Sequence, residues 1–482
     1  MIKSKTIDLL KSLDKSEMKE LEDFVNSPFF NKNKNVRKLF AGLKPFYPEF
    51  ENKKLTKEFL YSKIIPGKSF SDKTFRNLSS DLLALVEKYL AVSVLSRDPL
   101  YEKYLKISGL FKKSAYVLTE SNIKESEKIF DSSNFDGGNI LYTMHLIEME
   151  KDFLSISKNK LINLNMNEGE YLILSFISKY LIFKMKYYNY RYKLGTEKLS
   201  GFIGEFDKSI ELEPFMKYLE KEKKPFTEII LIYFYCTRFM NDLNANEFYY
   251  KVKPLLKKNM RNIIRSEIIN IYLTLNAFCV AKIRNGEQEY ERELFNLYKD
   301  MLDENLLTEG ELHLHITIFN NIITMGLKLG EYEWVFQFLD KYTEKLLPEF
   351  RETMYNYSYS QYYFYRKEFE KALAHINKVN FENYYIKSGV RTLLLKIYYE
   401  LKYTESFFSL ADSLKHYLSG DKQIPEDKRT TDYNMVSLTT RLFKHRLEPS
   451  KSGLDDLKFD IQNTRTGSHK EWLVEKISEL KK

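Results

Sequence analysis

Apolar and polar residues alternate with a period of three to four along most of the chain. In residues 71–90 the apolar positions step by three and four, and they are Phe75, Leu78, Leu82, Leu85 and Tyr89. This spacing places all five on one side of an α-helix. Ser71 or Asp72 can cap that helix by accepting the free N–H groups of its first turn. No segment shows the sustained alternation typical of a strand, so we expect an all-α fold.

Composition supports the same fold class. Gly and Pro are scarce, at 17 and 11 residues, which favours long helices over turn-rich β architecture. Four segments rich in Gly, Ser, Asn or Pro interrupt the helical pattern, at residues 132–139, 195–204, 419–431 and 448–456. GFIG at 201–204 belongs to the second of these segments and is expected to be a loop.

One local signal recurs in the second half of the chain. A short turn is followed by an aromatic residue and, three residues later, by a small or apolar one; the pairs are Tyr332 with Val335, Phe369 with Ala372, and Tyr403 with Ser406. The aromatic residues are 37 and 34 positions apart, and looser copies at Phe248 and Tyr290 precede them with steps of 42. Repetition at such a period predicts helix pairs that bury their apolar faces on their neighbours.

These copies resemble the tetratricopeptide repeat over about residues 226–420. The resemblance implies an α-solenoid of helix pairs, either a regular superhelix or an irregular stack. We therefore predict four regions in chain order, an N-terminal helical module at 1–97, an irregular helical region at 98–225, the repeats at 226–420 and a C-terminal helical cap at 421–482. The solenoid would thus be preceded by an irregular helical N-terminal region.

In the tetratricopeptide family, the first helix of each pair lines a concave groove that accepts an extended peptide or a partner's helix. Counting back from each turn aromatic, the resemblance implies a groove made of Asn320, Asn321, Thr324, Tyr357, Ser358, Gln361, Arg391 and Thr392. Amide and guanidinium groups there could bond to a peptide backbone. The run YNYSYSQYYFY at 355–365 also gives Tyr355, Tyr359 and Tyr362 one helical face, and aromatic residues serve both as core and as contact surface.

The N-terminal part of the chain carries most of the excess positive charge. Residues 1–100 hold 19 Lys or Arg against 13 Asp or Glu, so this fifth of the chain carries +6 of the net +9. Residues 55–90 read as helix, Pro-Gly turn, helix, and this segment is similar to the helix-turn-helix core of winged-helix domains. That resemblance implies DNA contacts by Lys68, Lys73, Arg76 and Asn77. The competing interpretation is a helical hairpin with a solvated basic face.

Signals of other functions are missing from the sequence. SKIIPGKS at 62–69 has Ser62 where a phosphate loop needs its leading glycine. His145 and Glu148 share a helical face, but no second Glu-x-x-His is apparent for a di-iron site. Cys236 and Cys279 lie in apolar stretches, which predicts buried, reduced thiols. No signal peptide or membrane-spanning stretch is apparent, so we expect a cytoplasmic protein.

The resulting hypothesis is a non-enzymatic protein–protein interaction scaffold without cofactor or metal, which binds a protein or peptide in the repeat groove. The alternative is a transcriptional regulator with DNA at residues 55–90 and a sensor in the repeats.

Overall fold

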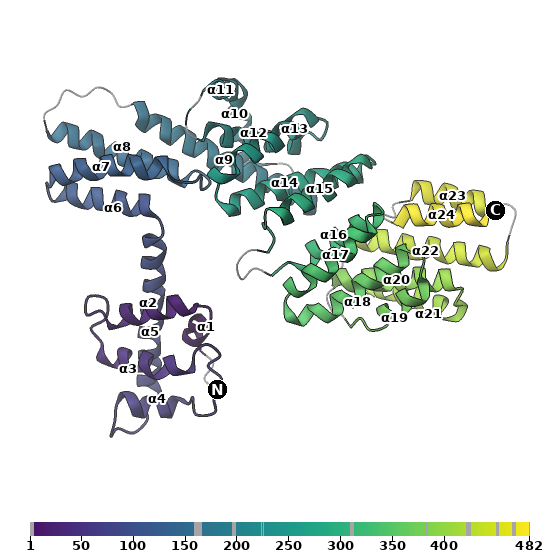
Figure 1. Ribbon diagram of the computed structural model, residues 1–482, viewed down its shortest axis with the longest axis horizontal. Helices are drawn as coiled ribbons and strands as arrows, with labels where there is room; N and C mark the ends of the chain where they lie inside the picture. The colour runs from purple at the N-terminus through teal and green to yellow at the C-terminus, as the bar shows by residue number, and fades with distance from the viewer. Residues whose placement is uncertain are drawn as a thin grey trace. The chain divides into compact units, whose positions relative to one another are not determined.

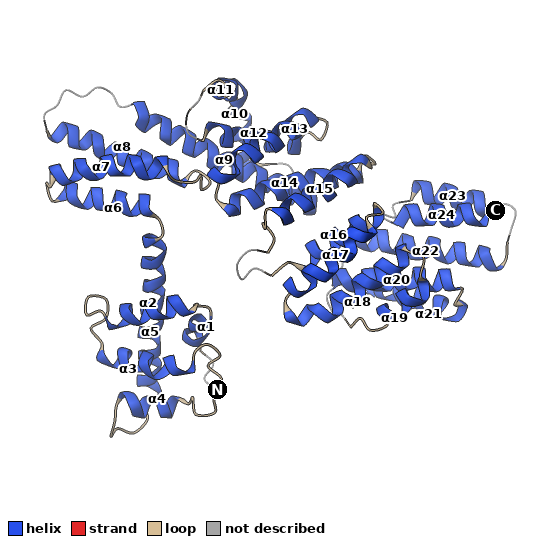
Figure 2. Cartoon of the chain, in the orientation of Figure 1, coloured by secondary structure: helices blue, strands red, loops and turns tan. Residues whose placement is uncertain are grey.

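The computed structural model is all-α (Figure 1). It describes residues 4–158, 166–194, 199–222, 224, 226–308, 313–380, 384–420, 426–449, 453–464 and 469–481. Among these residues there are 24 α-helices and no strand (Figure 2). No helix in the same residues is both long and apolar enough to cross a bilayer. The chain divides into two compact units, Met1–Lys179 and Tyr180–Lys482.

The first unit begins with five helices around one apolar core. They are α1 (Lys5–Lys11), α2 (Lys15–Asn26), α3 (Lys34–Leu43), α4 (Lys57–Ile64) and α5 (Asp72–Ser96). The five apolar residues expected on one side of α5 are all buried. Ser71 caps α5, because its Oγ accepts the N–H of Thr74 at 3.3 Å. Periodicity and cap are therefore confirmed here.

Three further helices of this unit pack on one another, α6 (Pro99–Lys112), α7 (Tyr116–Asp131) and α8 (Asn139–Ser157). The predicted break at 132–139 is the connection between α7 and α8. Helix α9 (Met166–Leu194) follows, and the division between the two units falls within it.

The second unit continues with α10 (Gly201–Ser209) and α11 (Leu212–Leu219). The expected loop at 201–204 is wrong, because GFIG forms the first turn of α10. Two glycines make this possible. Gly201 has a φ of 61°, and a Cβ on Gly204 would lie 2.7 Å from the carbonyl oxygen of Leu199. Glycine alone adopts the first conformation without strain and fits the second approach.

Five consecutive helix pairs follow in this unit. They are α12 (Thr227–Asn241) with α13 (Asn246–Asn259), α14 (Arg265–Arg284) with α15 (Glu289–Asp303), α16 (Ile316–Lys328) with α17 (Tyr332–Tyr342), α18 (Pro348–Tyr365) with α19 (Phe369–Ile376), and α20 (Tyr384–Leu401) with α21 (Thr404–Gly420). Each second helix begins at or within two residues of a predicted turn aromatic. Pairwise packing of neighbouring helices is therefore confirmed.

Four of the five pairs share one turn. A residue with a positive φ lies one or two positions after the end of the first helix, and it is Gly286, Gly330, Lys367 or Lys402. In each turn the next N–H reaches back five residues, as Glu331 does to the carbonyl of Gly326 at 2.9 Å and Glu368 to that of Tyr363 at 2.9 Å. This is the Schellman motif, which satisfies the last carbonyl groups of a helix.

The shared turn corrects the register of the last copy. Tyr403 is equivalent to Glu331 and Glu368, and Thr404 is the residue that takes the place of Tyr332 and Phe369. Ser406 is accordingly exposed, whereas Val335, Ala372 and Phe407 are buried. Tyr403 therefore lies one residue before the position that Tyr332 and Phe369 occupy in their copies.

Three helices end the chain, α22 (Glu426–Leu447), α23 (Gly453–Asn463) and α24 (Lys470–Leu480). Helix α22 begins inside the predicted break at 419–431, because the Glu, Asp, Lys and Arg residues from 426 onward are good helix formers or favour a helix start. Parts of three predicted breaks, residues 195–198, 421–425 and 450–452, lie outside the described residues.

Candidate functional site

The predicted groove residues on α18 lie between helices. Tyr357, Ser358 and Gln361 are buried, with 6%, 0% and 6% of their surface exposed. Gln361 donates its Nε2–H to Oδ1 of Asn320 at 2.9 Å, and the hydroxyl of Thr324 donates to Oε1 of Gln361 at 3.0 Å. The polar side chains expected to face a peptide therefore bond to one another across α16 and α18.

The same side of α18 also packs against α20. A Cβ on Gly389 would lie 2.5 Å from the hydroxyl oxygen of Tyr357, so the two helices are in close contact there. Thr392 is buried and donates to the carbonyl of Ser388 at 2.8 Å. Tyr357, Gln361 and Phe364 are four and three residues apart on α18 and are all buried. We call these three residues the closed face of α18.

Four predicted groove residues keep contact with solvent, and two of them, Asn320 and Thr324 of α16, are half-buried. Asn321 is exposed on α16. Arg391 is half-buried, with its guanidinium 4.7 Å from the ring centroid of Tyr417. The eight residues thus do not form one open surface.

Helix α24 covers the ends of the first helices of three pairs. Glu471 forms ion pairs with Lys328 at the end of α16, at 2.7 Å, and Glu475 with Lys367 at 3.0 Å. The indole N–H of Trp472 donates to Glu400 near the end of α20 at 2.9 Å. Trp472 is 8% exposed, so this end of the pairs is closed.

Lys396 lies beneath α24. Its ammonium is 5.1 Å from the ring centroid of Trp472 and 6.0 Å from that of Phe364. Burial lowers the pKa of Lys396 to about 8, because removing water disfavours the charged form, although Glu400 and Glu471 oppose this effect.

The opposite side of α18 is open. Tyr355 is 42% exposed, Tyr359 and Tyr363 are half-buried, and Phe336 of α17 is 45% exposed. His375 of α19 stacks on Tyr359 and on Tyr363, with ring centroids 5.5 Å apart in both cases. We call Phe336, Tyr355, Tyr359, Tyr363 and His375 the aromatic face. Of the predicted Tyr stripe, Tyr355 and Tyr359 belong to this face, whereas Tyr362 is 6% exposed and packs inward.

The five rings are in continuous contact. Tyr359 lies 4.5 Å from Tyr355, 6.1 Å from Tyr363 and 6.2 Å from Phe336, measured between ring centroids. Burial lowers the pKa of His375, which favours its neutral form. At the rim, Arg366 and Lys371 both form ion pairs with Glu368, at 3.1 and 2.6 Å. The face is therefore apolar in the middle, and its rim carries two cations that share one carboxylate.

The predicted DNA-contacting residues lie at the start of α5 and in the turn before it. Lys68, Lys73, Arg76 and Asn77 are all exposed. Asp72 forms ion pairs with Lys57 and with Arg76, each at 2.9 Å, and these cations lower its pKa. In the described part of this unit, α5 is followed by α6 and not by a β wing.

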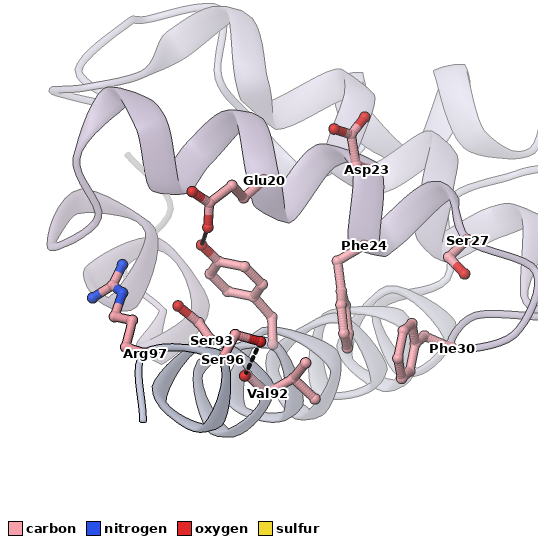
Figure 3. Close-up of a pocket in the computed structure, with 10 residues that line it drawn as sticks. Glu20, Asp23, Phe24, Ser27, Phe30, Val92, Ser93, Ser96 and Arg97 are labelled. Carbon is pink, nitrogen blue, oxygen red and sulfur yellow. Dashed lines mark hydrogen bonds between the residues drawn. The ribbon is translucent and has the colours of Figure 1, made fainter. Parts of the chain in front are cut away.

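A cavity of about 550 Å³ lies between α2 and the second half of α5 (Figure 3). Phe24 and Phe30 stack in its wall with ring centroids 4.1 Å apart, and Tyr89 lies 5.7 Å from Phe24. The hydroxyl of Tyr89 donates to Glu20 at 2.9 Å, and burial together with Glu20 raises the pKa of Tyr89 to about 12. No motif marked this cavity in the sequence, because its walls come from helices some 70 residues apart in the chain.

Cys236 and Cys279 are free and buried, as predicted. Burial raises the pKa of both thiols, and a buried neutral thiol is chemically inert. In the residues that the structure describes, no group of three or more His, Cys, Asp or Glu could hold a metal ion.

Comparisons of the chain with protein-family models, with curated proteins and with solved structures gave no match.

Proposed function

We propose that the chain is a non-enzymatic protein–protein interaction scaffold. Its helix pairs would form a tetratricopeptide-like α-solenoid, in which each pair is stabilised by its neighbours. Packing between successive pairs and the turn shared by four of them support this assignment. Solenoids offer extended surfaces for partners without needing catalytic groups.

The observation that carries the proposal is the aromatic face. Phe336 of α17 and Tyr355 of α18 are more than two-fifths exposed, although α18 buries Tyr357, Tyr362 and Phe364. Exposed clusters of Tyr, Phe and His with a polar rim are typical of partner surfaces, because large rigid rings bury much area at little entropic cost. We infer that a peptide or helix of a partner covers this face, rather than the predicted groove.

A capture experiment with matched variants tests this proposal. The aromatic-face variant combines Phe336→Ser with Tyr355→Ser. The control is Phe459→Ser, since Phe459 is 65% exposed on α23 and lies outside the face. A third variant, Asn321→Ala with Arg391→Ala, tests what remains of the predicted groove.

The unaltered chain and the control should capture the same proteins from the native cell extract. We expect the aromatic-face variant to capture none of them. Thermal unfolding of all variants should stay within a few degrees of the unaltered chain. If only the third variant fails to capture these proteins, the partner binds in the predicted groove and not on the aromatic face. If no protein is captured specifically by any form, the scaffold proposal fails.

DNA binding is the second candidate, supported by the exposure of Lys68, Lys73, Arg76 and Asn77. If it is correct, the full chain binds duplex DNA at low salt with an affinity that falls steeply as salt rises. Replacing Lys68 and Lys73 by Glu should then abolish binding, whereas Lys19→Glu with Lys32→Glu, which changes equally exposed lysines of the same unit, should weaken it much less. Absence of binding at about 50 mM salt rejects this candidate.

A further inference from the structure

The cavity between α2 and α5 combines two kinds of lining. Phe24, Phe30, Tyr89 and Val92 supply rings and methyl groups. Glu20 and Asp23 stand one turn apart on α2 at its rim, and both are exposed. In Figure 3 the carboxylate of Glu20 meets the hydroxyl of Tyr89, which lines the cavity, whereas that of Asp23 points away from the two Phe rings. An aromatic surface beside carboxylates attracts a cation by two independent effects.

The charge of the lining is only partly compensated within it, because Glu20 and Asp23 face the single cation Arg97. Arg97 is the only basic residue among the described residues that line the cavity, and its guanidinium is 3.1 Å from Glu17, a residue outside the lining. Glu17 is the main cause of the raised pKa of Arg97, and the charge of Glu20 adds to it. Glu20 accepts a bond from the neutral hydroxyl of Tyr89, which leaves its negative charge in place. The rim is therefore negative toward a ligand.

A lysine of the chain already uses this aromatic pair. The ammonium of Lys88, which is not part of the cavity lining, lies 5.4 Å from the ring centroid of Phe30. The pair of stacked rings is thus compatible with an alkylammonium group at contact distance. The second ring of the pair, Phe24, and the neighbouring Tyr89 border the cavity itself.

We propose that this cavity binds an aliphatic cation, a short methylene chain that ends in an ammonium or guanidinium group. The methylenes would lie against Phe24, Tyr89 and Val92, and the cation would meet Glu20 at the rim. A volume of about 550 Å³ is large enough for one such chain together with the atoms that carry it. The ligand is either a lysine or arginine side chain of another polypeptide or a free polyamine, since both present the same chemistry. This site is independent of the aromatic face.

Ligand-observed NMR titration of the full chain tests the proposal. The probes are 1,5-diaminopentane and the peptide acetyl-Gly-Lys-Gly-amide, and the neutral control is acetyl-Gly-norleucine-Gly-amide, which keeps the aliphatic chain and lacks the charge. We expect saturable binding of both cationic probes or of one, and none of the control. Tighter binding of the peptide assigns the site to a polypeptide side chain, and tighter binding of the diamine assigns it to a free amine.

Two variants locate the binding. Glu20→Gln should weaken it about tenfold, the usual loss for one charge-assisted contact. Glu87→Gln removes the same charge from an exposed position of α5 outside the cavity and should leave binding unchanged. Ser93→Trp fills the cavity and should abolish binding.

Three results would overturn the proposal. The first is equal binding of the norleucine peptide, which would mean an apolar groove only. The second is equal weakening by Glu20→Gln and Glu87→Gln, which would mean general attraction to an acidic surface. The third is no saturable binding of either cationic probe up to about 5 mM, a concentration that detects even weak sites.

Discussion

Helix α18 carries tyrosines on both of its sides, and the two sides have different surroundings. Tyr357 is two residues from Tyr355, about 200° away around the helix. The first is 6% exposed and the second 42% exposed. Residue type does not distinguish them, since both are tyrosines. The difference lies in the neighbours, because α16 and α20 pack on the closed face, while part of the aromatic face has no cover among the described residues.

The sharpest test of this difference is truncation of the two tyrosines. Tyr357→Ala should destabilise the chain by about 3–5 kcal/mol, because it opens a cavity between α18 and α20. Tyr355→Ala removes a ring that is already partly in water and should cost less than about 1 kcal/mol. Denaturant unfolding of the two variants measures both values. Equal losses would mean that the two sides are equally buried.

A second test addresses the polar contacts of the closed face. Gln361→Leu keeps the size of the side chain but leaves Asn320 and Thr324 without their partner. We expect a loss of about 1–3 kcal/mol in the free energy of unfolding, the usual penalty for stranding buried polar groups. Gln337→Leu, at an exposed position of α17, is the control and should change stability little.

Two serines of α18 should respond with opposite signs. Both are fully buried; Ser360 donates to the carbonyl of Ala372 at 2.9 Å, whereas the hydroxyl of Ser358 makes no hydrogen bond within the described structure. Ser360→Ala should therefore lower the free energy of unfolding by about 1 kcal/mol, and Ser358→Ala should leave it unchanged or raise it. A loss at Ser358 as large as that at Ser360 would indicate a partner for its hydroxyl.

A further effect is expected from pH. Because burial lowers the pKa of Lys396 to about 8 from its ordinary 10.5, the folded chain binds fewer protons than the unfolded chain between these values. Stability should thus rise with pH across this window through Lys396. Since one pKa unit corresponds to about 1.4 kcal/mol, the gain between pH 7.5 and 9.5 is about 2 kcal/mol. Lys396→Met should abolish this part of the pH dependence. Urea unfolding of both chains at pH 7.5 and 9.5 measures it, and an equal dependence in the variant would contradict the assignment to Lys396.

Local features of the fold could be predicted from the sequence. The stripe on α5 and its cap depend on spacings of three or four residues along the chain, and both are confirmed. The start of each second helix follows from a turn motif that spans a few residues. The expected loop at 201–204 is wrong for an equally local reason, because glycine permits a helix start as readily as a loop when its φ is positive.

Burial of the groove residues could not be predicted in the same way. Counting from the turn aromatic indicates which side of α18 a residue occupies, but not which helices pack against that side. The contacts of Gln361 reach back to α16, and those of Trp472 reach across 72 residues to Glu400. Such contacts depend on the path of the whole chain. The cavity between α2 and α5 was missed for the same reason.

The shared turns differ in one residue with a consequence for local opening. Gly286 and Gly330 take the left-handed conformation without strain, whereas Lys367 and Lys402 carry a Cβ in the same place. The later pairs therefore hold their turns at a cost of about 1 kcal/mol each, which packing within the pair must offset. Fluctuations that separate the two helices of a pair should accordingly be more frequent in α18–α19 and α20–α21 than in α14–α15 and α16–α17. The aromatic face includes residues of both α18 and α19, the first pair whose turn contains a lysine. A partner that binds this face would therefore also hold these two helices together.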